Sequence, residues 1–246
     1  TDMNVYTTDK IRNVVLLGHG GCGKTSLAEA MAYLSGITSR MGKVVDGNTI
    51  SDFGKEEQKR QISLATSVIP IEWEGVKINL LDSPGFFDFV GEVEEAASAA
   101  DAAIIVVSGK AGVEVGTEKA WDICEKYKLP RFIFVTDMDI DNASFRQVVE
   151  DMTAKYGKKM APFHLPIREN EKFVGYINVI TEQAYRWEGK EVVECEMPEY
   201  SKANLQICRD TLMEAVAETS EDFMERYFKG DIFSEADIRA ALRNNV

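Results

Sequence analysis

The fold is decided by the stretch Gly18-His19-Gly20-Gly21-Cys22-Gly23-Lys24-Thr25. It matches the pattern Gly-x-x-x-x-Gly-Lys-Ser/Thr at every position. An apolar run, Asn13–Leu17, precedes it, and a segment with apolar residues at helical spacing, Lys24–Leu34, follows it before Gly36 ends the helix. A strand that runs through a glycine-rich turn into a helix is the setting that supports phosphate binding over a chance turn.

The chemistry of this loop follows from its residue types. Glycines allow successive backbone N–H groups to point at phosphate oxygens, and the helix N-terminus adds a favourable dipole. We expect Lys24 to neutralise the β- and γ-phosphates and the Thr25 hydroxyl to ligate Mg²⁺. The candidate phosphate-binding residues are Gly18, His19, Gly20, Gly21, Cys22, Gly23, Lys24, Thr25 and Ser26.

A second candidate motif, Asp82-Ser83-Pro84-Gly85, follows two strand-like runs. The runs Ser67–Trp73 and Val76–Leu81 are joined at Glu74-Gly75, which is a hairpin signal. An acid at a strand end near a phosphate loop can hold Mg²⁺, and the N–H of the glycine can meet a γ-phosphate. This sequence is also a common turn, but its distance downstream of a phosphate loop favours the functional interpretation.

A third candidate motif, Thr136-Asp137-Met138-Asp139, follows the strand-like run Arg131–Val135. A carboxylate at this point can accept hydrogen bonds from the N1–H and N2–H₂ groups of guanine, whereas adenine has no such donor pair. We therefore expect Asp139 to select guanine. An acidic turn is the alternative, but the end of a parallel strand is where α/β proteins bind ligands.

The remaining pattern predicts the architecture. Further strand-like and helical runs alternate up to Gly157, with Ala102–Val107 as a buried strand and Asn142 as the cap of a helix. This predicts an α/β fold with a mostly parallel sheet and helices on both faces. Residues 1–157 would form the nucleotide-binding core. Residues 158–246 would form an α+β subdomain with antiparallel strands at Phe173–Ile180 and Ala184–Cys195, helical stretches over Ser201–Phe228 and a short helix capped by Ser234.

Composition limits the class of function. The 246 residues are 45% apolar and 28% charged, with a formal net charge of −13, so we expect no direct nucleic-acid binding by this segment. No apolar run has the length that a membrane span needs, and we expect no membrane partner. The four cysteines are far apart in the sequence, which favours a reduced, cytoplasmic compartment over a disulfide framework.

These motifs, their order and the sequence between them resemble the G domain of elongation factor G and its paralogues. The likeness covers nearly the whole chain, and it implies a P-loop GTPase fold in which residues 158–246 are the insertion subdomain of the G domain. It includes Gly42–Gly47, Glu57–Ser63, Asp82–Val90 and Ala111–Glu114. The resemblance implies binding of GTP and GDP, Mg²⁺ as cofactor, GTP hydrolysis, and the ribosome as partner of the full-length protein. It also implies an N-terminal fragment that ends before the last core strand.

The chain departs from the family pattern at functional positions. Gly21 replaces an aspartate of the phosphate loop, and Ser63 takes the place of the switch threonine that closes on Mg²⁺. The histidine that orients the attacking water is replaced by Phe86, which cannot hydrogen-bond water. Thr136 and Asp137 occupy the first two places of the Asn-Lys-x-Asp motif, so we expect weaker nucleotide affinity.

Because the chain departs from the family pattern at these positions, more than one function is compatible with the sequence. A GTPase would use Lys24, Gly85 and Mg²⁺ held by Thr25, Ser63 and Asp82, and it would be slow because of Phe86. A binding switch that senses nucleotide without hydrolysing it, or a factor of the ribosomal-protection type, is the alternative. A P-loop protein that uses ATP is a third alternative, which depends on the altered guanine motif and is disfavoured by Asp139.

Overall fold

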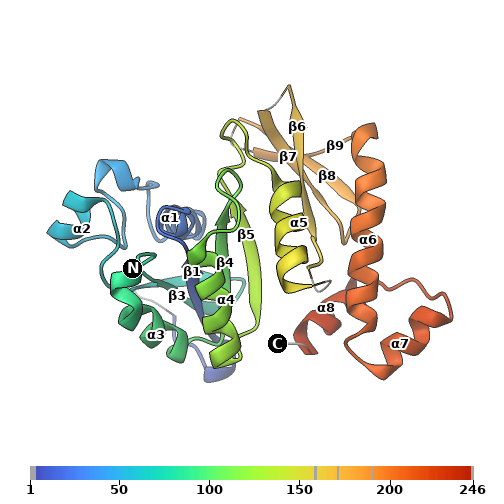
Figure 1. Ribbon diagram of the computed structural model, residues 1–246, viewed down its shortest axis with the longest axis horizontal. Helices are drawn as coiled ribbons and strands as arrows, with labels where there is room; N and C mark the ends of the chain where they lie inside the picture. Colours follow the sequence, from blue (N-terminus) through green and yellow to red (C-terminus); the bar gives the residue numbers. More distant parts are fainter. Residues whose placement is uncertain (1–3, 158–159, 171, 190, 245–246) are drawn as a thin grey trace. The chain divides into compact units, whose positions relative to one another are not determined.

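The computed structural model describes residues 4–157, 160–170, 172–189 and 191–244. The chain forms two compact units, residues 1–136 and 137–246 (Figure 1). The helix before Gly157, which we assigned to the nucleotide-binding core, therefore groups with the second unit. Residues 158 and 159, next to our expected subdomain boundary, lie outside the described residues, and that boundary stays a prediction.

The first unit is built on a five-stranded sheet with the order β2-β3-β1-β4-β5. The pairs β3–β1, β1–β4 and β4–β5 are parallel, and β2 runs antiparallel to β3. This arrangement confirms the predicted, mainly parallel α/β sheet. The strands are β1 (Ile11–Gly18), β2 (Ser67–Trp73), β3 (Val76–Asp82), β4 (Ala102–Ser108) and β5 (Arg131–Thr136).

The hairpin between β2 and β3 has the predicted two-residue turn. Glu74 and Gly75 have φ angles of 46° and 77°. Positive φ at both central residues gives the turn a twist that matches the flanking strands. The register pairs Trp73 with Val76 and places Asp82 opposite Ser67 at the far end of the hairpin.

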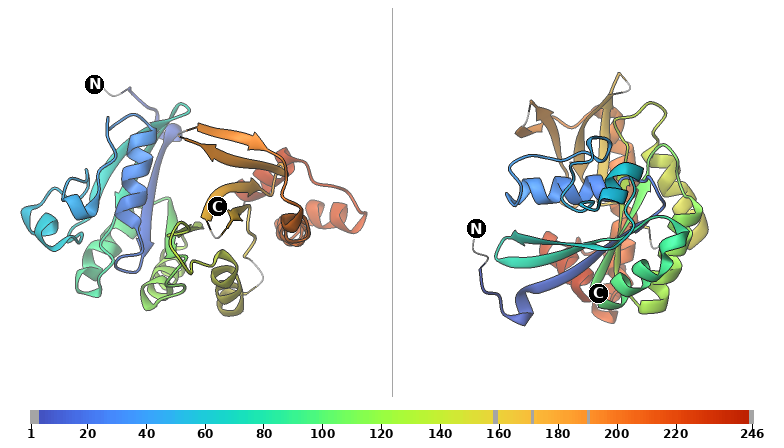
Figure 2. Two further views of the ribbon diagram at one scale, coloured as in Figure 1. Left: turned by 90° about the horizontal axis from the view of Figure 1, so that it is seen from above. Right: turned by 90° about the vertical axis from the view of Figure 1, so that its left-hand side faces the viewer.

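Helices cover both faces of this sheet (Figure 2). Leu16 of β1 packs with Ala28 and Ala32 of α1 on one face. Because side chains alternate along a strand, Leu17 points to the other face, where it lines a small cavity with residues of α3 and α4. The helices are α1 (Lys24–Leu34), α2 (Lys55–Arg60), α3 (Val90–Ala99) and α4 (Val115–Tyr127), and short 3₁₀ turns span Thr8–Lys10, Val44–Asp46 and Phe87–Phe89.

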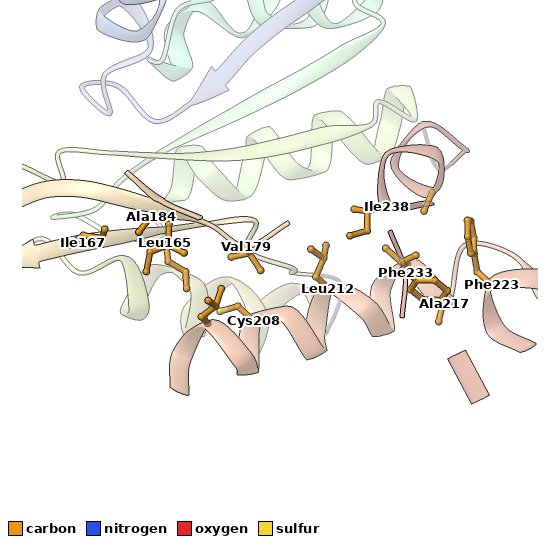
Figure 3. Packing of buried hydrophobic residues seen from close by; sticks show 14 residues of the cluster. Leu165, Ile167, Val179, Ala184, Cys208, Leu212, Ala217, Phe223, Phe233 and Ile238 are labelled. Carbon is orange, nitrogen blue, oxygen red and sulfur yellow. The ribbon is translucent and has the colours of Figure 1, made fainter. Parts of the chain in front are cut away.

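The second unit contains a four-stranded antiparallel sheet with the order β6-β7-β8-β9. One buried cluster contains Leu165 and Ile167 of this sheet together with Cys208 and Leu212 of α6 (Figure 3). The elements are α5 (Phe145–Tyr156), β6 (His164–Glu169), β7 (Lys172–Asn178), β8 (Gln183–Glu188), β9 (Glu191–Cys195), the 3₁₀ turn Glu199–Ser201, α6 (Lys202–Ala217), α7 (Glu221–Phe228) and α8 (Glu235–Asn244).

Two local predictions in this unit need correction, and both concern helix caps. The helical stretch Ser201–Phe228 breaks between α6 and α7, because the Ser220 hydroxyl accepts a hydrogen bond from the N–H of Phe223 (3.1 Å) and starts a new helix. Ser144, not Asn142, caps α5, accepting from the N–H of Gln147 (3.2 Å). Ser234 caps α8 as predicted, with Asp237 completing the capping box.

Candidate nucleotide-binding site

The phosphate loop joins β1 to α1, as the sequence predicts. A Cβ atom built on Gly18 would lie 2.4 Å from the carbonyl oxygen of Val106, so only glycine allows this approach to β4. Gly23 has φ 92°, the left-handed conformation that favours glycine immediately before the helix. Lys24, Thr25 and Ser26 form the first turn of α1, where backbone N–H groups have no intrahelical acceptor.

The Lys24 side chain lies inside the loop. Its ammonium donates hydrogen bonds to the carbonyl oxygens of Gly18 (3.1 Å) and His19 (2.9 Å). The thiol of Cys22 is 3.9 Å away. Because Lys24 is only 6% exposed, its charge acts in a poorly solvated space, where attraction to an anion is stronger than in water.

His19 links the loop to the start of α4. The Gly116 N–H donates a hydrogen bond to His19 Nδ1 (3.2 Å), and Nε2 lies 3.5 Å from the Glu114 carboxylate. A Cβ atom on Gly116 would lie 2.4 Å from the Cα atom of His19. Our sequence analysis included His19 but missed Glu114 and Gly116, because nothing in a local pattern pairs residues that are this far apart in the chain.

The three predicted magnesium ligands lie at the entrance to this loop. The hydroxyl oxygens of Thr25 and Ser63 are 3.2 Å apart. Asp82 is 1% exposed, and among the described residues neither of its carboxylate oxygens has a hydrogen-bond partner. Burial raises the pKa of Asp82 to about 6, against the lowering effect of the Thr25 and Ser51 hydroxyls and of the Lys24 ammonium.

Two further residues at this site were missed by our sequence analysis. Asp52 is buried; burial raises the pKa of its carboxyl group, and the Ser63 hydroxyl opposes this increase. Ser51 is also buried, and its hydroxyl has no hydrogen-bond partner in the described part of the chain. Hydroxyl and carboxylate oxygens are the ligands that Mg²⁺ prefers, so the donor set at this site fits that ion.

Two buried glutamates hold the segment that carries Asp52 and Ser63. Glu29 of α1 accepts hydrogen bonds from the N–H groups of Gly42 (2.8 Å) and Ile50. Glu57 accepts from the N–H groups of Gly54 and Leu64, both at 3.0 Å, and of Ala65 at 3.3 Å. Bonds between a carboxylate and backbone N–H groups are among the stronger hydrogen bonds in proteins. They fix the path of residues 42–65 next to α1.

The predicted Asp82–Gly85 motif continues from β3 towards the phosphate loop. The Ser83 hydroxyl donates to the carbonyl oxygen of Leu16 (2.6 Å), and Pro84 follows it. The backbone of Gly85 lies against Lys24 and Gly20, and the ring of Phe86 contacts Gly20. The structure therefore brings Gly85 and Phe86 next to the phosphate loop.

Thr136 ends β5 and contacts the phosphate loop directly. Its hydroxyl oxygen lies 2.7 Å from the carbonyl oxygen of Cys22 and 3.2 Å from that of Val107, within donating distance of each. Asp137, with φ 56°, begins the second unit and accepts at its carbonyl from the N–H of Ile140. Met138 and Asp139 follow within this turn, and the selection of guanine by Asp139 stays a prediction.

The described residues contain no group of three or more His, Cys, Asp and Glu side chains placed to hold a metal. A cation at Thr25, Ser63 and Asp82 would complete its coordination with water and with oxygen atoms of a bound ligand. Among the described helices, none combines the length and apolar character needed to cross a membrane.

Known proteins match this chain over most of its length. Elongation factor G of Thermotoga petrophila is 35% identical over 238 residues, which cover 96% of this chain and 34% of that protein. Elongation factor G of Neorickettsia sennetsu is 35% identical over 239 residues, with the same coverage. The chain thus spans about a third of the length of these curated relatives.

A solved structure and a family model also match most of this chain. The crystal structure of ttk003000868 from Thermus thermophilus matches with a TM-score of 0.90 and 38% identity, over 96% of this chain and 36% of that one. A model of the elongation factor Tu GTP binding domain matches residues 9–229. The chain therefore belongs to the family of elongation factor Tu GTP binding domains.

Proposed function

We propose that this chain binds GTP and GDP together with Mg²⁺ and hydrolyses GTP slowly. The observation that carries the proposal is the unpaired, buried carboxylate of Asp82 beside the Thr25–Ser63 hydroxyl pair, at the entrance to a phosphate loop. Burying a carboxylate without a partner is costly. A cation that arrives with a nucleotide would remove that cost.

Each residue has a distinct task in this proposal. The N–H groups of the loop and of the first turn of α1 bind phosphate oxygens, and Lys24 neutralises the β- and γ-phosphates. Thr25, Ser63 and Asp82 would hold Mg²⁺, which when bound supplies positive charge to the phosphate oxygens. The Gly85 N–H would bind the γ-phosphate, because this glycine already lies next to Lys24.

The proposed base selection depends on Asp139. Its carboxylate would accept hydrogen bonds from N1–H and N2–H₂ of guanine. Thr136 is already bonded to the loop through its hydroxyl, and Asp137 has no cationic stem to lie along the base. Affinity for guanine nucleotides would therefore be weaker than that of a relative with a lysine at this position.

Slow hydrolysis follows from Phe86. A phenyl ring can neither orient nor deprotonate the attacking water, so Lys24, the cation and backbone N–H groups would stabilise the phosphoryl charge without a positioned nucleophile. In the full-length protein, which we propose to be a cytoplasmic factor that acts on the ribosome, the partner would supply the missing polar group. The same residue favours a second candidate function, a nucleotide-dependent binding switch without hydrolysis.

A titration tests the proposal. We expect a fluorescent GDP analogue to bind in the presence of Mg²⁺, an ATP analogue to bind much more weakly, and Lys24→Ala to abolish binding of both. The control is Lys126→Ala, because Lys126 is an exposed residue of α4. Equal affinity for the two bases would refute the guanine assignment, and retained binding by Lys24→Ala would refute the phosphate-loop assignment.

A further inference from the structure

The Asp82–Gly85 segment is in direct contact with the phosphate loop. A Cβ atom built on Gly85 would lie 2.4 Å from the Lys24 ammonium, 2.7 Å from the Cα atom of Gly20 and 2.8 Å from the backbone nitrogen of Gly20. There is no space for a methyl group between these residues. A phosphate group is larger than a methyl group, so it cannot enter between Gly85 and Lys24 in this arrangement.

Phe86 extends this contact over the loop. A Cβ atom built on Gly20 would lie 2.9 Å from Cζ of the ring and 3.0 Å from each Cε atom. Three atoms at similar distances place the tip of the ring against the Gly20 backbone. The ring is 43% exposed, so one part of it covers the loop and the other faces solvent.

The phosphate loop is open at Gly21. A Cβ atom built on Gly21 would have no heavy atom within 4 Å. The first turn of α1 starts at Lys24, and its N–H groups are available to phosphate oxygens. The obstruction by Gly85 and Phe86 therefore does not extend to Gly21.

We infer that Phe86 determines specificity, favouring the diphosphate over the triphosphate. The inference rests on the proposed function. The γ-phosphate is the group that must lie near Lys24 and the Gly85 N–H, and this is the space that Gly85 and Phe86 fill. GTP must displace both residues from Gly20 and lose their contact, whereas GDP ends before the obstruction.

An apolar cavity beside Phe86 offers a place for the displaced ring. It has a volume of about 40 Å³ and is lined by Phe86 itself, Leu17 of β1, Val93 of α3 and Ala120 of α4. This volume holds about three water molecules, in surroundings that offer few polar partners. When the ring leaves Gly20, it keeps an apolar environment by moving towards this cavity, so the size of the cavity also sets the affinity for GTP.

The experiment compares the ratio of the dissociation constants for a non-hydrolysable GTP analogue and for GDP, both with Mg²⁺. Phe86→Ala removes the ring and leaves only the Gly85 contact for GTP to displace, so it should lower the GTP-to-GDP ratio about threefold to tenfold, the range expected from burial of part of an aromatic ring. Ala120→Leu fills the cavity and should raise the ratio, and Val93→Ala enlarges the cavity and should lower it. Phe134→Ala is the matched control, because Phe134 is a similarly exposed phenylalanine of β5.

The outcomes separate this inference from the proposed function. If GDP does not bind to the unmodified protein, the proposed function fails. If GDP binds and the ratio is the same in Phe86→Ala as in the unmodified protein, only the inference fails. Loss of GDP binding in Phe86→Ala would also overturn it, because Phe86 would then support the loop instead of competing with the γ-phosphate.

Discussion

Replacing Asp82 by asparagine should stabilise the protein without ligand and weaken nucleotide binding. The carboxylate is 1% exposed, and in the described part of the chain neither oxygen has a hydrogen-bond partner. Asparagine keeps the shape of the side chain but carries no charge to desolvate. The same substitution removes a proposed ligand of Mg²⁺, so opposite effects are expected with and without magnesium and nucleotide.

The size of the effect follows from the pKa of Asp82. Burial raises it from 3.8 to about 6, and a shift of about two units corresponds to about 3 kcal/mol. In the folded protein the group binds its proton more tightly than in the unfolded chain, so its contribution to stability falls as pH rises from about 4 to about 6. The gain from Asp82→Asn should therefore be largest, near 3 kcal/mol, at pH 8 and should vanish near pH 4.

Urea unfolding of both proteins between pH 4 and pH 8, in EDTA and without nucleotide, measures this difference. Asp141→Asn is the control, because Asp141 is an exposed aspartate and its replacement should change little at any pH. A second series with Mg²⁺ and GDP should favour the unmodified protein, which binds the ligand more tightly. The reasoning is refuted if Asp82→Asn is no more stable than the unmodified protein at pH 8 in EDTA, or if the difference does not change with pH.

Three other substitutions test separate parts of the structure. Gly116→Ala places a Cβ atom 2.4 Å from the Cα atom of His19, so we expect it to shift the phosphate loop and to weaken GDP binding about tenfold in the same titration. Phe86→His restores a group that can orient water, and single-turnover GTP hydrolysis should become faster; an unchanged rate would contradict the role assigned to this position. Ser220→Ala removes the cap of α7 and should lower the free energy of unfolding by about 1 kcal/mol, without changing GDP affinity.

The local elements of the first unit could be predicted because their signals are local. The phosphate loop joins a buried strand to a helix with bounds Lys24–Leu34, as expected. The Glu74-Gly75 turn needs two residues with positive φ, and Gly75 accepts that conformation without strain. Such signals lie within a few residues of one another. The cap of α5 was predicted less well, because Asn142 and Ser144 both favour caps and only the backbone path decides between them.

The supporting acids could not be predicted, because their partners are distant in sequence. Glu57 lies in a charged segment, Lys55–Arg60, that has the composition of an exposed helix, yet it is buried and bonded to the backbone of the following residues. Glu29 has helical neighbours that are apolar or small, and its acceptance of the Gly42 N–H depends on where residues 42–50 return to α1. A carboxylate in a helix gives no sign in the sequence that it will bind distant backbone groups.

In the proposed nucleotide complex, these buried acids would give the ligand control of the segment between Gly42 and Leu64. Glu29 and Glu57 are compensated by backbone N–H groups and keep the segment next to α1. Asp52 and Asp82 are not compensated in this way: burial raises the pKa of both carboxyl groups, and the charges of neighbouring acids raise each pKa further. Glu29 and Glu57 thus stabilise this position of the segment, whereas the buried charges of Asp52 and Asp82 destabilise it. A cation between Ser63 and Asp82 would remove the opposing contribution, so its arrival with a nucleotide would stabilise the segment and its loss would release it.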